Sequence, residues 1–363
     1  MKGLEITRRR LHNSGLTETS FEAPDEVVRW HGAMQAQDYG PAKWSIGQRA
    51  TKLVDADLDR ALATGSILRT HVLRPTWHFV ARDDIRWLLA LTGPRVQQHN
   101  GPRYRELELD ERTCARCEAL IVSALEGGNH LTRNAIAGLL DDAGINRSGQ
   151  RLPFILMHCE LEAAISSGPL VGKQQTYALL EERAPNARRL ERDEALAELA
   201  RRYLTSHGPA TVQDLRWWSS LTLADIRKAL DMLGSEVQSE TIDGITLWAM
   251  ASDVSPPPIK RGVYLLQPYD ELVVGYTESR YFGGPRAAAA RAAWRDRSLP
   301  NGVVILNGRV AGHWRRTIER DSLKVEVVLY EDPKPGDVRA LEAGAEDLGR
   351  FLGRRVRLEA TRL

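Results

Sequence analysis

Two glutamines, Gln35 and Gln37, are side chains whose type and spacing point to chemistry. A neutral amide is not a useful general base at pH 7. Its oxygen accepts hydrogen bonds and its nitrogen donates them, so it can orient a water molecule. Two such amides facing one site would suit a reaction in which the scissile bond breaks largely by itself and water needs only to be aimed.

The backbone decides whether these two amides can face one site. Residues two apart point the same way on an extended segment, whereas on a helix they diverge by about 200°. Pro41 disfavours helix at Gly40, so we expect both glutamines where a helix gives way to a loop. The alternative is a pair of surface glutamines at a frayed helix end, and the residues taken alone favour it.

Other groups of reactive side chains are weaker candidates. Cys114 and Cys117 have a zinc-like spacing, but no second Cys/His pair lies nearby, so we predict two helix cysteines and no metal. No Gly-rich phosphate loop and no nucleophile elbow is present, and no cofactor is expected. Asp270 and Glu271 form a paired carboxylate after a strand, for which a structural turn or cap is favoured over catalysis.

The composition is that of an ordinary globular protein. Of 363 residues, 42% are hydrophobic and 27% are charged, which excludes disordered, collagen-like and membrane-embedded chains. No apolar run approaches the ~20 residues that cross a bilayer, and the charged segment 1–10 lacks the apolar core of a secretory signal. Three cysteines fit a reducing compartment. We therefore expect a cytoplasmic protein without membrane contact.

One arrangement of elements recurs three times: two or three short helices followed by a two-stranded ribbon. The expected helices lie at 26–34, 43–49 and 55–64, then at 112–126, 131–143 and 152–166, then at 193–206, 212–219 and 222–233. The expected ribbons lie at 66–73 with 76–81, at 170–171 with 176–179, and at 237–242 with 246–250. The expected caps are Gly65, Thr132, Thr211 and Thr222. Helices followed by such a ribbon are typical of a winged helix, so we predict an α+β fold built as a tandem winged-helix array.

A proline-rich stretch at 255–258 interrupts this pattern and is expected to be a stiff linker. Beyond it, short apolar runs, an Asn307-Gly308 turn and helices expected at 285–296 and 340–352 indicate a β-rich unit. The apolar runs lie at 263–267, 272–276, 302–306, 310–314, 325–330 and 356–359. We therefore expect winged-helix units at 1–108, 109–190 and 191–254, with the glutamines in the first, and a basic C-terminal unit at 255–363.

The formal net charge of +2 conceals an asymmetry along the chain. Residues 1–105 carry 16 Lys and Arg against 11 Asp and Glu, and residues 255–363 carry 19 against 14. The middle, residues 106–254, carries 15 against 23. A polyanion would therefore contact the two ends. A random scatter of surface charge explains these numbers equally well.

Winged-helix units usually place a helix in the major groove of DNA and touch phosphates with their wings. The candidates for such contacts are Arg69, His71 and Arg74 on the first ribbon, and Arg309, His313, Arg315 and Arg316 in the C-terminal unit. For each of them, a residue that keeps an exposed ribbon soluble and protects its edge is at least as good an interpretation.

Five segments, in order along nearly the whole chain, together resemble the AlkZ-like family of winged-helix DNA glycosylases. They are MQAQDY at 34–39, WSIG at 44–47, RTHVLRPTWH at 69–78, LLQPYDE at 265–271 and GRVAGHWRR at 308–316. The combination is more specific than any one segment. The catalytic motif of the family is a glutamine, an apolar residue and a second glutamine, with aspartate in one branch. It falls here on Gln35, Ala36 and Gln37, in the glutamine branch.

The resemblance implies a C-shaped array with a basic concave face that excises bulky or crosslinked alkylated purines from double-stranded DNA. Several members of the family provide self-resistance against DNA-alkylating natural products. Trp77 and His78 match the pattern of the first unit, and we expect them at the DNA-binding surface without a defined catalytic role. A bulky adduct would not fit a base pocket, so we expect recognition from the groove without full base extrusion. A monomer is expected.

Two other functions stay open at this point. Winged helices mostly bind DNA without chemistry, so a non-catalytic DNA-binding protein or regulator is one alternative. A protein-interaction scaffold is the other.

Overall fold

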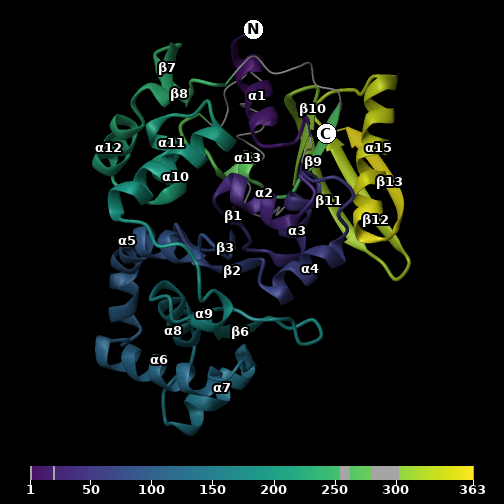
Figure 1. Cartoon of the computed structure of the whole chain (residues 1–363). Helices are drawn as coiled ribbons and strands as arrows, with labels where there is room; N and C mark the ends of the chain where they lie inside the picture. Colours follow the sequence, from purple (N-terminus) through teal and green to yellow (C-terminus); the bar gives the residue numbers. More distant parts are fainter. Residues whose placement is uncertain (1, 19–20, 254–261, 280–301, 363) are drawn as a thin grey trace.

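The computed structural model describes residues 2–18, 21–253, 262–279 and 302–362. Within them the chain forms four small sheets accompanied by helices, a mixed α/β arrangement (Figure 1). The linker expected at 255–258 and the helix expected at 285–296 lie outside the described residues.

The first unit contains the sheet that carries the glutamines. Its elements are α1 (Lys2–Asn13), α2 (Pro24–His31), β1 (Met34–Gln35), α3 (Tyr39–Gly47), α4 (Asp55–Thr64), β2 (Ile67–Val72), β3 (Arg74–Ala81) and α5 (Ile85–Glu106). The three strands are antiparallel, in the order β1-β3-β2. Gly65 adopts the predicted left-handed conformation at the end of α4, with φ 79°, and the chain then turns into β2.

The third unit follows the predicted order of elements, and the second departs from it. The second has α6 (Glu111–Leu125), β4 (His130–Thr132), α7 (Arg133–Asp142), α8 (Arg151–Leu161), β5 (Ile165–Ser167), β6 (Thr176–Leu179) and α9 (Leu180–Arg183). In this unit β4 was not predicted, and the ribbon expected at 170–171 with 176–179 is wrong, because β6 pairs with β5 and β4 while Val171 makes only an isolated bridge to Gln174. The third has α10 (Arg192–His207), α11 (Val212–Ser219), α12 (Leu223–Leu233), the 3-10 turn Gly234–Glu236, β7 (Val237–Ile242) and β8 (Ile245–Met250). The hydroxyls of Thr132, Thr211 and Thr222 each cap a helix by accepting a backbone hydrogen bond, which confirms the three predicted N-caps.

The C-terminal residues form the largest sheet, and the prediction of a β-rich unit is confirmed. Its elements are β9 (Val263–Leu266), α13 (Glu271–Val274), β10 (Gly302–Leu306), β11 (Arg309–Ile318), β12 (Ser322–Leu329), α15 (Pro335–Leu352) and β13 (Arg355–Arg362), and the strand order is β13-β12-β11-β10-β9. Only β13 is parallel to its neighbour, because α15 carries the chain back across the sheet. Asn307 and Gly308 both have positive φ and make the predicted turn between β10 and β11.

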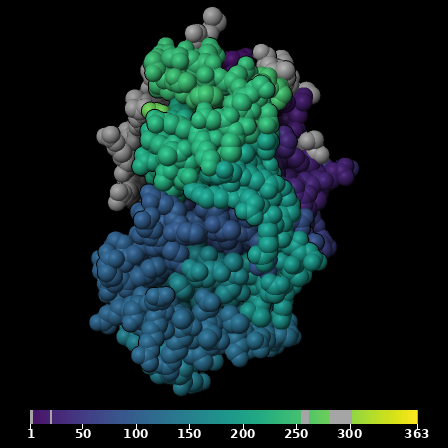
Figure 2. All heavy atoms as spheres, turned by 60° about the vertical axis from the view of Figure 1, so that its left-hand side comes forward, coloured from purple at the N-terminus to yellow at the C-terminus, as the bar shows by residue number. Residues whose placement is uncertain are grey.

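The hydrophobic core crosses between units. One buried cluster joins β2, β3 and α5 to α10, α11 and α12, and it contains Trp87 and Trp218. A second joins α2, α3 and β1 to the C-terminal sheet and α15, and it contains Trp44 and Trp314. The first unit therefore packs between the third unit and the C-terminal sheet (Figure 1). The second unit has a core of its own and forms the lower part of the molecule (Figure 2). The boundaries at 108, 190 and 254 stay predictions.

The helix expected at 26–34 is shorter in the structure. It ends at His31, because Gly32 follows with a φ of 79° that does not continue a right-handed helix. Met34 and Gln35 then pair with β3. The glutamine segment is therefore extended, as expected, but it follows a short turn rather than the helix end itself.

The helix expected at 43–49 begins earlier, and the prediction that Pro41 disfavours helix at Gly40 was wrong. The helix starts at Tyr39 and includes Gly40. Pro41 lies in its first turn, where a missing N–H costs no intrahelical hydrogen bond and the fixed φ of proline suits a helix.

The helix expected at 152–166 also ended too late. It stops at Leu161, Ala163 has a positive φ of 59°, and residues 165–167 form β5. Four further helices, α1, α5, α9 and α13, had no counterpart among the predictions. α13 lies where the apolar run 272–276 was expected, and α5 contains Pro94 and Pro102 in its interior.

Candidate active site

The pairing of β1 with β3 opens at the glutamine segment. Ala36 still donates its backbone N–H to the Trp77 oxygen at 2.7 Å. The return bond is missing: the Trp77 N–H goes to Gln37 Oε1 at 3.2 Å, and the Ala36 oxygen accepts from Arg69 Nε at 3.0 Å. Two side chains thus replace one ladder bond, and the strand pair ends where Gln37 lies.

Gln35 is fixed from two sides. The residue is 8% exposed, and its side-chain Oε1 accepts a hydrogen bond from Arg74 Nη2 at 2.9 Å. Its backbone N–H donates to Glu271 Oε1 at 2.6 Å. Arg74 also lies 3.4 Å from His78 Nε2. Arg74 therefore orients the side-chain amide of Gln35, and Glu271, from a distant part of the chain, holds its backbone.

Gln37, in contrast, is exposed. Both glutamine side chains accept a hydrogen bond from the first residues of β3, Gln35 from Arg74 and Gln37 from Trp77. A carbonyl oxygen has two lone pairs, so each amide oxygen can accept one further hydrogen bond. Gln35 and Gln37 thus place one buried and one exposed amide beside the first residues of β3.

Positive charge and an aromatic ring border these amides. The Arg69 guanidinium lies 4.3 Å from the Trp77 ring centre, and burial lowers the pKa of Arg69. Burial, assisted by the Arg74 charge, lowers the pKa of His78 to about 3. A neutral His78 can donate from Nδ1 to the Thr76 oxygen at 2.9 Å and accept from Arg74 at Nε2. His78 is therefore a neutral imidazole at neutral pH, and the positive charge beside the amides comes from Arg69 and Arg74.

His71 lies deeper than a DNA contact would require. It is 4% exposed, its Nδ1 is hydrogen-bonded to Glu160 of α8, and its ring centre lies 4.4 Å from that of Trp77. Its contact with DNA stays a prediction, and the structure gives it a partner in the second unit. Glu160 itself gave no signal in the sequence.

Of the four candidate DNA-contacting residues on β11, the structure places one, Arg316, beside the glutamine segment. A terminal nitrogen of Arg316 lies 3.7 Å from where a Cβ on Gly40 would be, beside the glutamine segment. Burial lowers the pKa of Arg316, although the charges of Asp38 and Asp55 act to raise it. Its Nη1 has no hydrogen-bond partner among the described residues. The other three do not share this position: Arg309 is exposed, Arg315 pairs with Glu326 at 2.8 Å, and the His313 ring lies 6.0 Å from Tyr330.

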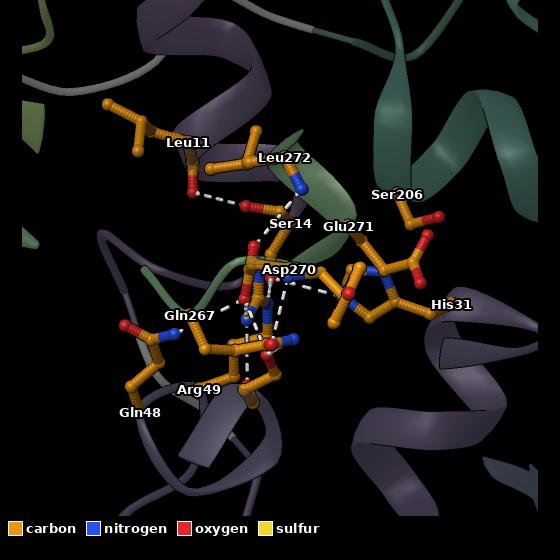
Figure 3. Close-up of polar contacts among 12 residues, drawn as sticks. Leu11, Ser14, His31, Gln48, Arg49, Ser206, Gln267, Asp270, Glu271 and Leu272 are labelled. Atoms are coloured by element: carbon orange, nitrogen blue, oxygen red, sulfur yellow. Dashed lines mark hydrogen bonds and ion pairs between the residues drawn. The ribbon is translucent and has the colours of Figure 1, made fainter. Parts of the chain in front are cut away.

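The paired carboxylate divides into two roles. Asp270 caps α13 and accepts two hydrogen bonds from Arg49, each of 2.7 Å, and both side chains are fully buried (Figure 3). The turn-or-cap interpretation is therefore right for Asp270. Glu271 instead contacts Gln35, which the sequence did not predict. Its signals in the sequence were its place after a strand and the LLQPYDE segment of the family resemblance.

The two cysteines with zinc-like spacing lie in a helix, as predicted. Cys114 and Cys117 lie in α6 and are buried in the core of the second unit. Burial raises the pKa of Cys114 to about 11, which keeps it a neutral thiol. Of the helices that the structure describes, none is long and apolar enough to cross a membrane.

Comparison with known proteins gives consistent matches over almost the whole chain. A family model described as DNA glycosylase AlkZ-like matches residues 28–351. An "Interstrand DNA cross-link repair glycosylase" from Streptomyces sahachiroi is 26% identical over 359 residues, covering 92% of each chain. The solved structure of the Streptomyces sahachiroi DNA glycosylase AlkZ has the same fold, with a TM-score of 0.80, 21% identity and 98% of each chain covered.

Proposed function

The chain belongs to the AlkZ-like DNA glycosylase family, and from this premise we propose that it hydrolyses the N-glycosidic bond of cationic alkylated purines with a water molecule held by Gln35 and Gln37. Membership favours an enzyme over the non-catalytic regulator and the scaffold. The observation that carries the proposal is the end of the β1–β3 pair, where both amide oxygens accept hydrogen bonds beside Arg69 and Arg74.

The chemistry follows from what an amide can do. A guanine alkylated at its ring nitrogen seven is a cation, so it leaves as a neutral base and needs no protonation. The sugar left behind has oxocarbenium character. The two amide oxygens would accept hydrogen bonds from water, aim its lone pair at the anomeric carbon and favour the developing positive charge. The water then loses a proton to solvent, and the products are the free base and an abasic site.

The proposed substrates include bulky adducts and interstrand crosslinks, since the Streptomyces relative is named for crosslink repair. Exposed Gln37 supports recognition from the groove without full extrusion, because at least one amide lies at the surface. We propose that the protein acts as a monomer, because the units pack on one another within one chain. Sedimentation analysis tests this.

The protein is expected to release free base from duplexes that contain 7-methylguanine and not from matched duplexes with guanine or O6-methylguanine. Only the first base carries the positive charge that makes it a good leaving group. The DNA strand should stay intact until alkali is added, because no lysine is proposed as nucleophile and no lyase step is expected. Chromatography of the released base and denaturing gels measure both outcomes. Equal release of a neutral purine would contradict the proposed substrate class.

Arg316→Ala is expected to weaken binding to duplex DNA roughly five- to tenfold and to reduce the slope of log affinity against log salt by about one. The reason is that Arg316 places a guanidinium next to Gly40, close to the proposed site. Arg357→Ala is the matched control, since this arginine is exposed on β13 of the same sheet and pairs with Glu359. Fluorescence anisotropy at several salt concentrations measures both, and equal effects would remove Arg316 from the interface.

A further inference from the structure

Glu271 has no part in the chemistry described above, yet it is 1% exposed and hydrogen-bonded to the glutamine segment. One carboxylate oxygen accepts the Gln35 N–H at 2.6 Å. The other accepts from Trp218 Nε1 at 2.9 Å and lies 3.2 Å from His207 Nε2. In Figure 3 this carboxylate points away from the Asp270–Arg49 pair, toward the side where His31 and Ser206 lie.

The position of Gln35 in the sheet explains why it needs such a partner. Gln35 faces His78 across the sheet, and β1 is the edge strand. At this position of an antiparallel pair the backbone N–H points away from the neighbour, here toward the open edge of the sheet. A buried N–H without an acceptor is costly. The carboxylate takes the place that a further strand would occupy, and a hydrogen bond to a charged acceptor is a strong one.

Gln35 is thus held at both ends by opposite charges. Burial alone would raise the pKa of Glu271, but the hydrogen bond and charge of His207 and the charge of Arg74 outweigh it and keep the carboxylate ionised. Arg74 in turn holds the Gln35 amide oxygen. The anion fixes the backbone of Gln35 and the cation fixes its side chain.

We propose that Glu271 is a positioning residue for Gln35, through which the third unit and the C-terminal residues set the geometry of the active site. Glu271 begins α13, Trp218 lies on α11 and His207 ends α10, so one carboxylate joins three segments to β1. The inference rests on the proposed function of Gln35.

Glu271→Gln is expected to slow single-turnover base release from a 7-methylguanine duplex roughly ten- to hundredfold, with DNA affinity and the fraction of active protein unchanged. The side chain introduced at position 271 has one amide oxygen and one amide nitrogen. Its nitrogen is a donor and cannot accept, so either the hydrogen bond from Trp218 or the one from the Gln35 backbone is lost. Asp214→Asn is the matched control. Asp214 is also a buried carboxylate, and it bonds Thr211, Thr277 and Ser279 rather than the proposed site. The Asp214→Asn substitution should lower the stability of the protein, but the folded molecules should release the base at the wild-type rate.

Combining variants separates this inference from the proposed function. In a Gln35→Ala background, Glu271→Gln should slow the reaction no further, because its effect acts through Gln35. Glu271→Asp keeps the charge but is too short to reach Gln35, Trp218 and His207 together, so it should also slow release. This second variant keeps the test possible if Glu271→Gln does not fold. Fully additive effects, an unaffected rate in the Glu271 variants, or an equal loss in Asp214→Asn would overturn the positioning role. A Gln35→Ala enzyme with normal rate would instead contradict the proposed function.

Discussion

Gln35→Ala and Gln37→Ala are each expected to slow base release from a 7-methylguanine duplex by roughly 100-fold, the loss typical of one oriented electrostatic group in an active site. DNA affinity should change little, because neither amide carries charge. Gln37→Ala is the cleaner test, since its bond partner, the Trp77 N–H, can be satisfied by water at this exposed position. Gln35→Ala also leaves Arg74 without one acceptor, so its stability must be measured alongside.

Single-turnover kinetics with enzyme in excess give the rate of the chemical step. Gln98→Ala provides the control, because Gln98 is an exposed glutamine on α5 that bonds only to its neighbour Arg95 among the contacts described. Wild-type rates in both Gln35→Ala and Gln37→Ala would show that neither glutamine is catalytic. The active site of this family member would then lie elsewhere.

Asp270→Asn is expected to destabilise the protein by about 3–5 kcal/mol, the cost of leaving one partner of a buried ion pair uncompensated. Arg49 and Asp270 are both fully buried and joined by two hydrogen bonds of 2.7 Å. Asp270 further accepts from Ser45 Oγ at 2.8 Å and caps α13 next to Glu271. The loss should therefore disturb the contact between the first unit and the C-terminal residues as well.

Urea unfolding measures this prediction. Asp332→Asn is the matched control, since Asp332 pairs with Arg362 at the surface, and exposed pairs of this kind contribute little. Its urea midpoint should stay at the wild-type value. A wild-type midpoint for Asp270→Asn would contradict the view that this pair fixes the first unit to the C-terminal residues.

Much of the fold could be predicted because its signals are local. Capping residues such as Thr132 and Thr222, the left-handed Gly65 and the Asn307-Gly308 turn mark element ends by short-range chemistry. Errors arose where local and long-range preferences compete. Met34 was assigned to a helix, but it pairs with Phe79, more than forty residues away, and no local pattern reveals such a pairing.

The candidate site shows the same division. The family resemblance identified the motif at Gln35 and Gln37, whereas the residues taken alone favoured two surface glutamines. Their two-residue spacing indicated the extended backbone. The residues that hold it could not be predicted: Glu271, Trp218 and His207 reach the site only through tertiary packing. The arginines of the β11 segment looked equivalent in sequence, and only the folded sheet separates Arg316 from Arg315.

In the proposed reaction, two amides face an anomeric carbon that has gained positive charge. The most direct test compares binding to two duplexes, one with a cationic azasugar at the abasic position and one with a neutral tetrahydrofuran analogue. Groups that act on the transition state bind its mimic more tightly than a neutral analogue. The wild-type protein should prefer the azasugar duplex, and the Gln35→Ala/Gln37→Ala protein should lose that preference while it still binds the neutral duplex. A preference that survives in the double variant would show that the two amides do not act on the charged sugar.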